Sequence, residues 1–344
     1  MTAHLVVERA GLFDTLQDRG RIGFQALGMP VAGVMDRIAF RLANALVGNA
    51  DDLAVIEIGV MGPTLRVEAD SVRLAVVGPV TLDLMAGPEA AAKPLEANRS
   101  HLLLRGQRLR VGMVDGVSTA YLAIEGGLAV APFMGSLATY TRAGIGGVDG
   151  RKLRDGDTLP LVRTAASPRA ERKLGTAFDY GRGPIRVVPG PQVDHFSDAG
   201  HATFLGSEYA VSKEADRMGI RFEGPVIAHS DKGPDIVSDG IAPGSIQVPG
   251  AGLPIVLLAD RQTVGGYAKI ATVISADLPR LGRMLPGQKV TFAAVTVAEA
   301  EALRRDQEKR LAQAVAGLQP ALPEGGIDLT ALYERNLIDG VVWA

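Results

Sequence analysis

The sequence predicts a mainly β protein with a few helices. Its 344 residues include 42 glycines and 20 prolines, which are spread between short runs of valine, isoleucine and leucine. Short β-branched runs bounded by glycine and proline are typical of strands joined by tight turns. Hydrophobic residues make up 47% of the chain, enough to fill one large core or two ordinary ones, and at this length two are expected.

Strand patterns occur along most of the chain, and one clear helix interrupts them near the N-terminus. Asp36 is placed to cap a helix that runs to about Val47, and Gly48 and Asn49 follow as residues that commonly end helices. The clearest strand patterns are Leu5–Glu8, Leu65–Val67, Val72–Val77, Ala120–Ile124, Ile185–Val188 and Val290–Ala294.

Helical patterns return toward the C-terminus. A short helix is expected to begin at Asp277. Thr296-Val-Ala-Glu299 is a capping box, which predicts a charged amphipathic helix from Val297 to about Val315. A further short pattern runs from Asp328 to Asn336.

The least regular part of the chain lies between Thr164 and Pro184. It is rich in alanine, arginine, lysine and glycine and shows no clear period. Domain boundaries usually fall in such segments. We therefore predict an N-terminal β domain at residues 1–165, a second β domain at 184–295 and a helical extension at 296–344.

Composition narrows the possible functions. The formal net charge of −2 gives no electrostatic basis for nucleic-acid binding. No apolar run approaches the roughly 18 residues that a membrane-spanning helix needs, and the first residues lack the pattern of a signal peptide. The chain has no cysteine, which excludes thiol catalysis and disulfides and favours a reducing compartment. We expect a soluble, cytoplasmic protein.

The most informative segment is residues 255–274, IVLLADRQTVGGYAKIATVI. An apolar run ends in four polar residues, a Gly-Gly pair follows, and a second β-rich run begins. This pattern predicts a hairpin with Gly265 and Gly266 at its turn. In that register Gln262 lies opposite Lys269, and strand alternation places Asp260, Gln262, Tyr267 and Lys269 on one face.

That face is the first candidate site. Its carboxylate, amide, phenol and ammonium suit a small polar ligand, and bare glycine N–H groups suit an anion. Asp260 is expected to accept an amide N–H, while Arg261 or Lys269 binds a carboxylate or phosphate. A polar hairpin tip in water is the alternative. The expected catalytic residues here are Asp260 and Lys269, and the expected binding residues are Arg261, Gln262, Thr263, Gly265, Gly266 and Tyr267.

Two further groups of residues are candidates. Glu208, Asp216 and Arg217 lie in the string SEYAVSKEADRMG, where a solvated ion pair is the alternative reading. We expect a catalytic role for Asp216 and binding roles for the other two. Gln192 and His195 follow a predicted strand, and a histidine there can act as a base, although a structural role is the alternative. No spacing of metal ligands is found in the sequence.

Several strings resemble, in order, those of the KipA/PxpC family, also called allophanate hydrolase subunit 2 or the biotin-dependent carboxyltransferase-like family. The resemblance extends from about Leu5 to about Phe292. At Asp14 the family usually has threonine or serine, and at Val264 it usually has a second threonine. The strings are GLFDTLQDRGRIGFQALGMPVAGVMDRIAFRLANALVGN (11–49), GSLATYTRAGIGGVDGRKLRDGD (135–157), VVPGPQVDHF (187–196), SEYAVSKEADRMGIRFEGP (207–225), DIVSDGIAPGSIQVPGAGLPIVLLADRQT (235–263) and LLADRQTVGGYAKIATVISADLPRL (257–281).

The resemblance implies two cyclophilin-like β-barrel domains in tandem. It also implies a subunit of a bacterial ATP-dependent 5-oxoprolinase, which opens the lactam of 5-oxoproline to glutamate together with a KipI-like and a LamB/YcsF-like subunit. ATP, with Mg²⁺, is then the expected cofactor of the complex, and the chain is expected to be inactive alone.

Two alternatives remain open at this point. One is the carboxyltransferase part of a biotin-dependent urea or amide carboxylase, which would bring biotin as cofactor. The other is a regulatory protein without activity that antagonises a KipI-like kinase inhibitor. Both enzymatic readings share one chemical problem, because an amide or urea group must be polarised at oxygen or deprotonated at nitrogen before it reacts.

Overall fold

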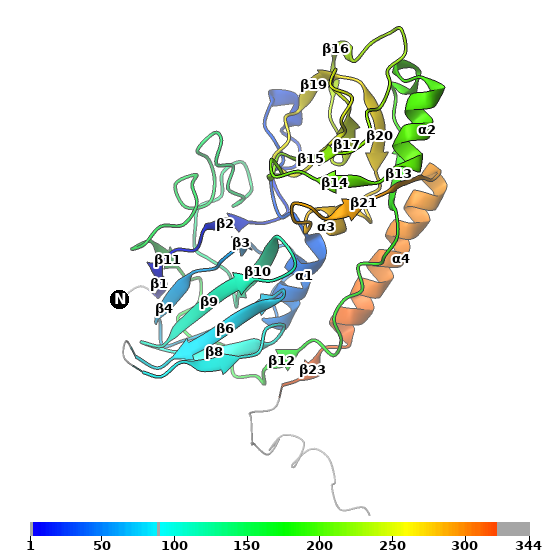
Figure 1. Ribbon diagram of the computed structural model, residues 1–344. Coiled ribbons are helices and arrows are strands. Elements are labelled where there is room, and N and C mark those ends of the chain that lie inside the picture. Colours follow the sequence, from blue (N-terminus) through cyan, green and yellow to red (C-terminus); the bar gives the residue numbers. More distant parts are fainter. Residues whose placement is uncertain (1–2, 88–89, 322–344) are drawn as a thin grey trace, which may run out of the picture.

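The computed structural model describes residues 3–87 and 90–321. The chain folds into two β-rich bodies, and a long helix runs from the second back along the first (Figure 1). The predicted fold class, mainly β with a few helices, is confirmed. The predicted pattern from Asp328 to Asn336 lies outside the described residues.

The first body contains two antiparallel sheets that enclose one core. Inward-facing residues such as Leu5, Val67 and Leu109 from one sheet pack with Ile56 and Leu122 from the other. In spatial order the six-stranded sheet is β11 (Thr158–Pro160), β1 (His4–Arg9), β4 (Thr64–Glu68), β9 (Arg108–Val114), β6 (Val80–Met85) and β7 (Lys93–Leu95). The five-stranded sheet is β2 (Phe13–Gln17), β3 (Val55–Gly59), β10 (Thr119–Ile124), β5 (Ser71–Val77) and β8 (Ser100–Leu104).

Helix α1 (Arg37–Leu46) packs against the other face of the five-stranded sheet. As predicted, Asp36 caps it, and its side chain accepts hydrogen bonds from the N–H groups of Ile38 (2.9 Å) and Ala39 (3.1 Å). The segment before the helix includes the 3-10 turn η1 (Gln25–Leu27) and reaches the second body, where Ala32 N–H donates to Ala259 O at 3.1 Å.

The second body is built on one eight-stranded sheet that nearly closes on itself. Its two outermost strands, β21 and β22, are consecutive in sequence, and only Thr291 lies between them. The sheet edges therefore meet, which gives a nearly closed barrel. The spatial order is β21 (Lys289–Val290), β14 (Tyr209–Val211), β15 (Gly219–Glu223), β18 (Ile255–Leu257), β17 (Ser245–Gln247), β20 (Lys269–Val273), β13 (Ile185–Pro189) and β22 (Phe292–Ala294).

Two strands leave this barrel and form a separate ribbon at its end (Figure 1). They are β16 (Asp235–Gly240) and β19 (Val264–Tyr267), and Val237 on the ribbon is 93% exposed. The other elements of this body are η2 (Val193–His195), α2 (Asp198–Gly206) and α3 (Leu278–Leu281), the short helix predicted after Asp277.

The long helix α4 (Val297–Ala316) begins with the predicted capping box of Thr296 and Glu299. Leu311 of α4 is buried in the same apolar cluster as α1, so the helix returns to the first body. Beyond it, β23 (Gln319–Pro320) pairs with β12 (Arg172–Lys173). The extension thus packs on the first body, while the predicted domain limits stay a prediction.

The predicted hairpin over residues 255–274 is wrong. Strand β18 pairs with β15 and β17, β19 pairs with β16, and β20 pairs with β13 and β17. Gly265 and Gly266 therefore lie inside a strand, and Lys269 lies opposite Gln247 instead of Gln262. A Cβ on Gly265 would lie 2.6 Å from Gln247 Nε2, so this glycine allows close packing and does not make a turn.

Candidate functional site

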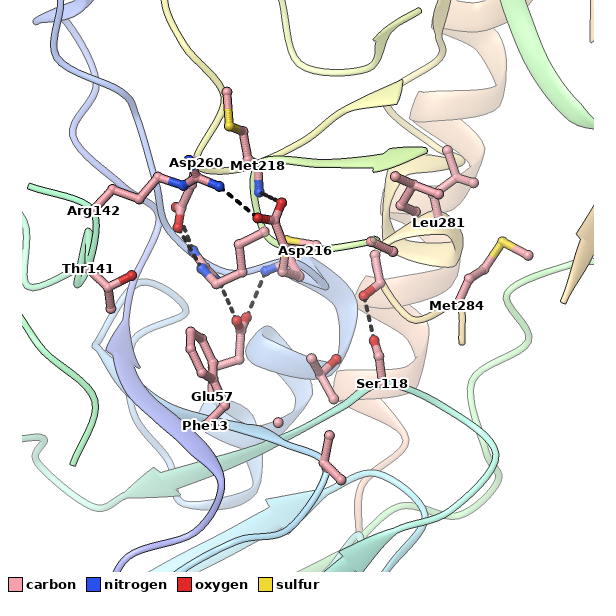
Figure 2. Close-up of a pocket in the computed structure, with 18 residues that line it drawn as sticks. Phe13, Glu57, Ser118, Thr141, Arg142, Asp216, Met218, Asp260, Leu281 and Met284 are labelled. Atoms are coloured by element: carbon pink, nitrogen blue, oxygen red, sulfur yellow. Dashed lines mark hydrogen bonds and ion pairs between the residues drawn. The ribbon is translucent and has the colours of Figure 1, made fainter. Parts of the chain in front are cut away.

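A pocket of about 410 Å³ lies where the two β-rich bodies meet (Figure 2). Strands β2, β3 and β10 of the first body form one wall, and the loops around β15, β18 and α3 of the second form the other. The lining residues are Phe13, Met35, Glu57, Gly59, Val60, Ser118, Thr119, Thr141, Arg142, Ala215, Asp216, Arg217, Met218, Ile220, Asp260, Leu281, Gly282 and Met284.

The polar end of the pocket is a buried triad of Glu57, Arg217 and Asp260. Arg217 binds Asp260 through two parallel hydrogen bonds, from Nε to Oδ2 and from Nη2 to Oδ1, each 3.0 Å long. Its Nη1 binds Glu57 Oε1, and its Nη2 also donates to Gly33 O at 2.6 Å. Both acids are buried, with side chains that are 4% exposed for Glu57 and 6% exposed for Asp260. One guanidinium therefore joins the two bodies across the pocket.

The backbone explains why these side chains converge. Arg217 ends the loop before β15, and Asp260 is in the turn after β18, the neighbouring strand. A backbone hydrogen bond from Asp260 N–H to Arg217 O (2.9 Å) holds the two loops together. Glu57 comes from the middle of β3, where strand alternation turns it toward the second body.

Glu57 has further partners that fix its position. Its Oε2 accepts hydrogen bonds from Tyr121 OH (2.9 Å) and from Met35 N–H (2.8 Å). Burial, and then the charges of Glu57 and Asp36, raise the pKa of Tyr121 well above its ordinary value. Tyr121 therefore remains a neutral donor to Glu57.

Burial by itself lowers the pKa of the Arg217 guanidinium, because it disfavours the charged form. The charges of Glu57 and Asp260 outweigh burial, and the net pKa of Arg217 is raised. Arg217 thus stays protonated. Four of the five N–H donors of its guanidinium are used, and one N–H on Nη1 is left for another acceptor.

An exposed ion pair marks the mouth of the pocket. Arg142 Nη2 from the first body lies 2.9 Å from Asp216 Oδ2 of the second, and both side chains are more than half exposed. Asp216 Oδ1 also accepts the N–H groups of Met218 (2.8 Å) and Gly219 (3.1 Å), which orders the loop before β15. The pair can separate at little cost, because exposed ion pairs contribute little free energy.

The remaining walls are mostly apolar. Phe13, Met35, Ile220, Leu281 and Met284 supply most of the surface between the triad and the mouth. A ligand with a small apolar body and polar groups at both ends therefore matches this pocket.

Three of the predicted site residues meet at this pocket, namely Asp260, Arg217 and Asp216. The role of each as a site residue stays a prediction. The other predicted residues do not line the pocket, and they are dispersed over the second body.

Lys269 and Gln192 form a second polar cluster with Asp239. Lys269 Nζ binds Asp239 Oδ2 (2.6 Å) and Gly240 O (3.1 Å), while Gln192 Oε1 accepts the Lys269 N–H (3.2 Å). The hydrogen bond from Lys269 lowers the pKa of Asp239. Lys269 is 3% exposed, so the ribbon strand β16 covers it. The expectation that Asp260 and Lys269 share one face is wrong, because the strands that follow β18 separate.

The remaining residues between Arg261 and Tyr267 also point to different places. Arg261 is 3% exposed and donates to two backbone carbonyls, and Gln262 Oε1 is buried without a partner among the described residues. Thr263 O accepts the Ile241 N–H at 3.0 Å, and the Tyr267 side chain is 43% exposed on the ribbon.

Glu208 and His195 lie elsewhere on the second body. Glu208 makes an ion pair with Lys289 (2.6 Å), in which both side chains are more than half exposed, and this fits the solvated alternative. His195 Nδ1 lies 2.9 Å from Gly233 O, which is a structural contact. Among the described residues, no three histidine, aspartate or glutamate side chains are grouped to hold a metal ion.

Sequence reasoning missed Glu57 and Arg142. Glu57 interrupts the apolar run of β3, Val55-Ile56-Glu57-Ile58, and a lone acid within a buried strand is a usable signal for a paired carboxylate. Arg142 has no such signal, because it lies in a long glycine-containing loop whose position depends on the first body as a whole.

Comparison with known proteins agrees with this architecture. The chain is 35% identical over 312 residues to the 5-oxoprolinase C subunit of Escherichia coli (strain K12), a match that covers 90% of this chain and 97% of that protein. The 5-oxoprolinase C subunit of Haemophilus influenzae is 36% identical over 300 residues, which cover 87% of this chain and 94% of that protein.

Longer proteins contain a similar region. The urea amidolyase of Saccharomyces cerevisiae is 29% identical over 318 residues, which cover 87% of this chain but 17% of that protein. The crystal structure of the Kluyveromyces lactis urea carboxylase superposes with a TM-score of 0.80 at 27% identity and covers 91% of this chain and 29% of that one. The crystal structure of the K. lactis urea amidolyase superposes with a TM-score of 0.79 at 27% identity. This match covers 91% of this chain and 20% of that one.

No helix among the described residues has the length and apolar character needed to cross a membrane. The family described as "Carboxyltransferase domain, subdomain A and B" matches residues 27–294, which is most of the chain and includes all the residues that line the pocket except Phe13. This agrees with the resemblance found in the sequence. The chain belongs to this carboxyltransferase-domain family.

Proposed function

We propose that this chain is the component of an ATP-dependent 5-oxoprolinase that holds the lactam, and that it works with a KipI-like and a LamB/YcsF-like subunit. The supporting observation is the near full-length similarity to two proteins that are named as the C subunit of 5-oxoprolinase. The pocket between the two β-rich bodies supports this proposal, because its carboxylates and guanidinium groups are suited to an amide and lie beside apolar side chains.

The pocket chemistry fits a lactam with a carboxylate. In this proposal the free N–H on Arg217 Nη1 polarises the lactam oxygen, and the carboxylate of Asp260 or Glu57 accepts the lactam N–H. The apolar walls contact the ring methylenes. At the mouth, Arg142 exchanges Asp216 for the carboxylate of the substrate.

The same pocket does not fit a nucleotide. Two guanidinium groups and three carboxylates line it, so its net charge opposes a triphosphate. ATP with Mg²⁺ is therefore expected to bind elsewhere in the assembly. Two of the pocket hydroxyls donate to groups that are not bases: Ser118 Oγ donates to Gly282 O at 2.9 Å, and Thr119 Oγ1 donates to Tyr121 OH at 3.4 Å. We expect little turnover by the chain alone.

The test is reconstitution. The chain is mixed with its KipI-like and LamB/YcsF-like partners, 5-oxoproline, ATP and Mg²⁺, and glutamate is measured. Ala215→Phe fills the pocket and is expected to abolish turnover, whereas Ala202→Phe, on the exposed face of α2, keeps it. Glutamate formation by the single chain, or full activity of the Ala215→Phe complex, contradicts the proposal.

Carboxyl transfer to urea is the second candidate, supported by the structural similarity to urea carboxylase. Urea and lactam share the amide group that the triad would bind, but the urea reaction requires biotin on a carrier. Supplying carboxybiotin and urea in place of ATP and 5-oxoproline separates the two functions. A neighbouring LamB/YcsF-like gene favours the oxoprolinase, and biotin-carboxylase genes favour the carboxylase.

A further inference from the structure

A separate cavity lies at the N-terminal end of α1. It has a volume of about 70 Å³, several times the roughly 10–15 Å³ that one water molecule needs. It shares Met35 with the pocket between the two β-rich bodies and is otherwise formed by different residues. Two arginines line it, Arg37 from the first turn of α1 and Arg261 from the loop after β18, while the other lining residues are uncharged.

Arg261 is a buried cation without a carboxylate. Its side chain is 3% exposed, its Nε donates to Ile241 O (3.2 Å), and its Nη1 donates to Leu258 O (3.1 Å). Within residues 3–87 and 90–321 it makes no ion pair. Burial, and then the charge of Arg37, lower the pKa of Arg261 to about 10. It remains protonated at neutral pH, so an uncompensated positive charge lines this cavity.

Arg37 adds a second free guanidinium. In the described part of the chain it makes no hydrogen bond or ion pair through its side chain, and it also lines an adjoining cavity of about 440 Å³. Partial desolvation, and then the charges of Arg304 and Arg19, lower its pKa, although the charge of Glu308 opposes them.

The other arginines of the larger cavity are already paired. Arg41 Nε binds Asp51 (2.9 Å), and Arg304 Nη2 binds Glu308 (2.5 Å). The unpaired positive charge is therefore concentrated on Arg37 and Arg261, near the start of α1.

We propose that Arg37 and Arg261 bind one phosphate group of a small phosphate-bearing ligand in the 70 Å³ cavity, and that the 440 Å³ cavity takes the rest of that ligand. Guanidinium groups bind phosphate through paired, charge-assisted hydrogen bonds, and Arg37 has all its donors available. This site is independent of the proposed function, because it requires no turnover.

The test is binding of inorganic phosphate, pyrophosphate and ATP to the full chain by isothermal titration calorimetry. We expect saturable binding that Arg37→Gln weakens by about tenfold or more, since it removes hydrogen bonds between charged groups. Arg37→Lys is expected to restore only part of the affinity. Arg305→Gln is the matched control, because Arg305 is on the exposed face of α4 and pairs with Glu301 only.

Thermal denaturation distinguishes a loss of ligand binding from a loss of folding. Arg37 is exposed and unpaired, so Arg37→Gln should melt like the wild type without ligand, and pyrophosphate should raise the Tm of the wild type more than that of the variant. Absence of saturable binding, or equal affinity of Arg37→Gln and wild type, would overturn the proposal.

Discussion

Asp260 and Lys269 stand nine positions apart in the same stretch of sequence, yet they belong to different parts of the molecule. Both are buried, at 5% and 3% exposure, and both are ion-paired. Asp260 binds an arginine that also binds Glu57 in the other β-rich body. Lys269 binds Asp239, whose side chain is 52% exposed on a ribbon of the same body.

The comparison shows that burial of one partner does not decide how much an ion pair contributes. In the triad around Arg217, both acids lose solvent, so removal of one member leaves the others without compensation. In the Lys269 pair, Asp239 keeps half its solvent contact and tolerates the loss of its partner. The triad couples the two bodies, and the Lys269 pair secures only the local ribbon.

The largest effect is expected for Arg217→Met, which leaves Glu57 and Asp260 buried as unpaired charges. The expected loss in the free energy of unfolding is about 3–5 kcal/mol. Urea denaturation of the variant measures it. Arg221→Met is the control, because the pair of Arg221 with Glu214 is exposed. A loss for Arg217→Met no greater than for the control would show that the triad does not join the bodies.

Asp14 is a buried carboxylate that, unlike Asp260, has no arginine partner among the described residues. Asp14 is 1% exposed, its Oδ1 has no partner among the described residues, and burial raises its pKa to about 7. Because the folded state holds this proton more tightly than the unfolded state does, ionisation removes stability as the pH rises from about 4 to about 7.

Asp14→Asn removes this titration. Between pH 5 and pH 8 the wild type should lose about 2–3 kcal/mol of unfolding free energy that the variant does not lose. The variant should therefore gain that much relative to the wild type. Urea denaturation of both proteins at several pH values measures the difference. A difference that does not change with pH would contradict the raised pKa of Asp14.

Asp260→Asn is expected to reduce both stability and turnover. Asp260 is in a turn, where substitution of an exposed side chain would hardly change the Tm, but its side chain is buried against Arg217. Loss of one charged hydrogen-bond partner should cost about 1.5–3 kcal/mol of stability. Parallel melting and assay of the reconstituted complex test this. An unchanged Tm would show that the ion pair of Asp260 with Arg217 does not stabilise the fold.

Lys269→Met should have the smallest effect. Methionine keeps the apolar stem in place, and Asp239 remains solvated, so the Tm should fall by less than about 4 °C. The ribbon itself is the sensitive readout, and hydrogen exchange of β16 and β19 should increase. A Tm loss as large as that of Arg217→Met would mean that both pairs contribute alike, and the distinction between them would fail.

Local signals explain what could be predicted. The Asp36 cap, the Thr296 capping box and the strand patterns depend on neighbours within a few residues, and the structure confirms them. The predicted turn at Gly265 failed because a Gly-Gly pair serves both tight turns and close strand packing, and only the partner strand distinguishes the two.

The sequence by itself determined the fold class, the family and three of the pocket residues, since these depend on residue periodicity and on ordered motifs. Only the tertiary structure decided that Arg217 joins Asp260 to Glu57, 160 positions away from it, and that Lys269 turns to the ribbon. The physical reason is that the partner of each strand depends on the packing of the complete barrel and not on its neighbours in sequence. Residues that are neighbours along the chain separate when their strands take different partners, and charges from distant segments meet where burying them alone would cost too much.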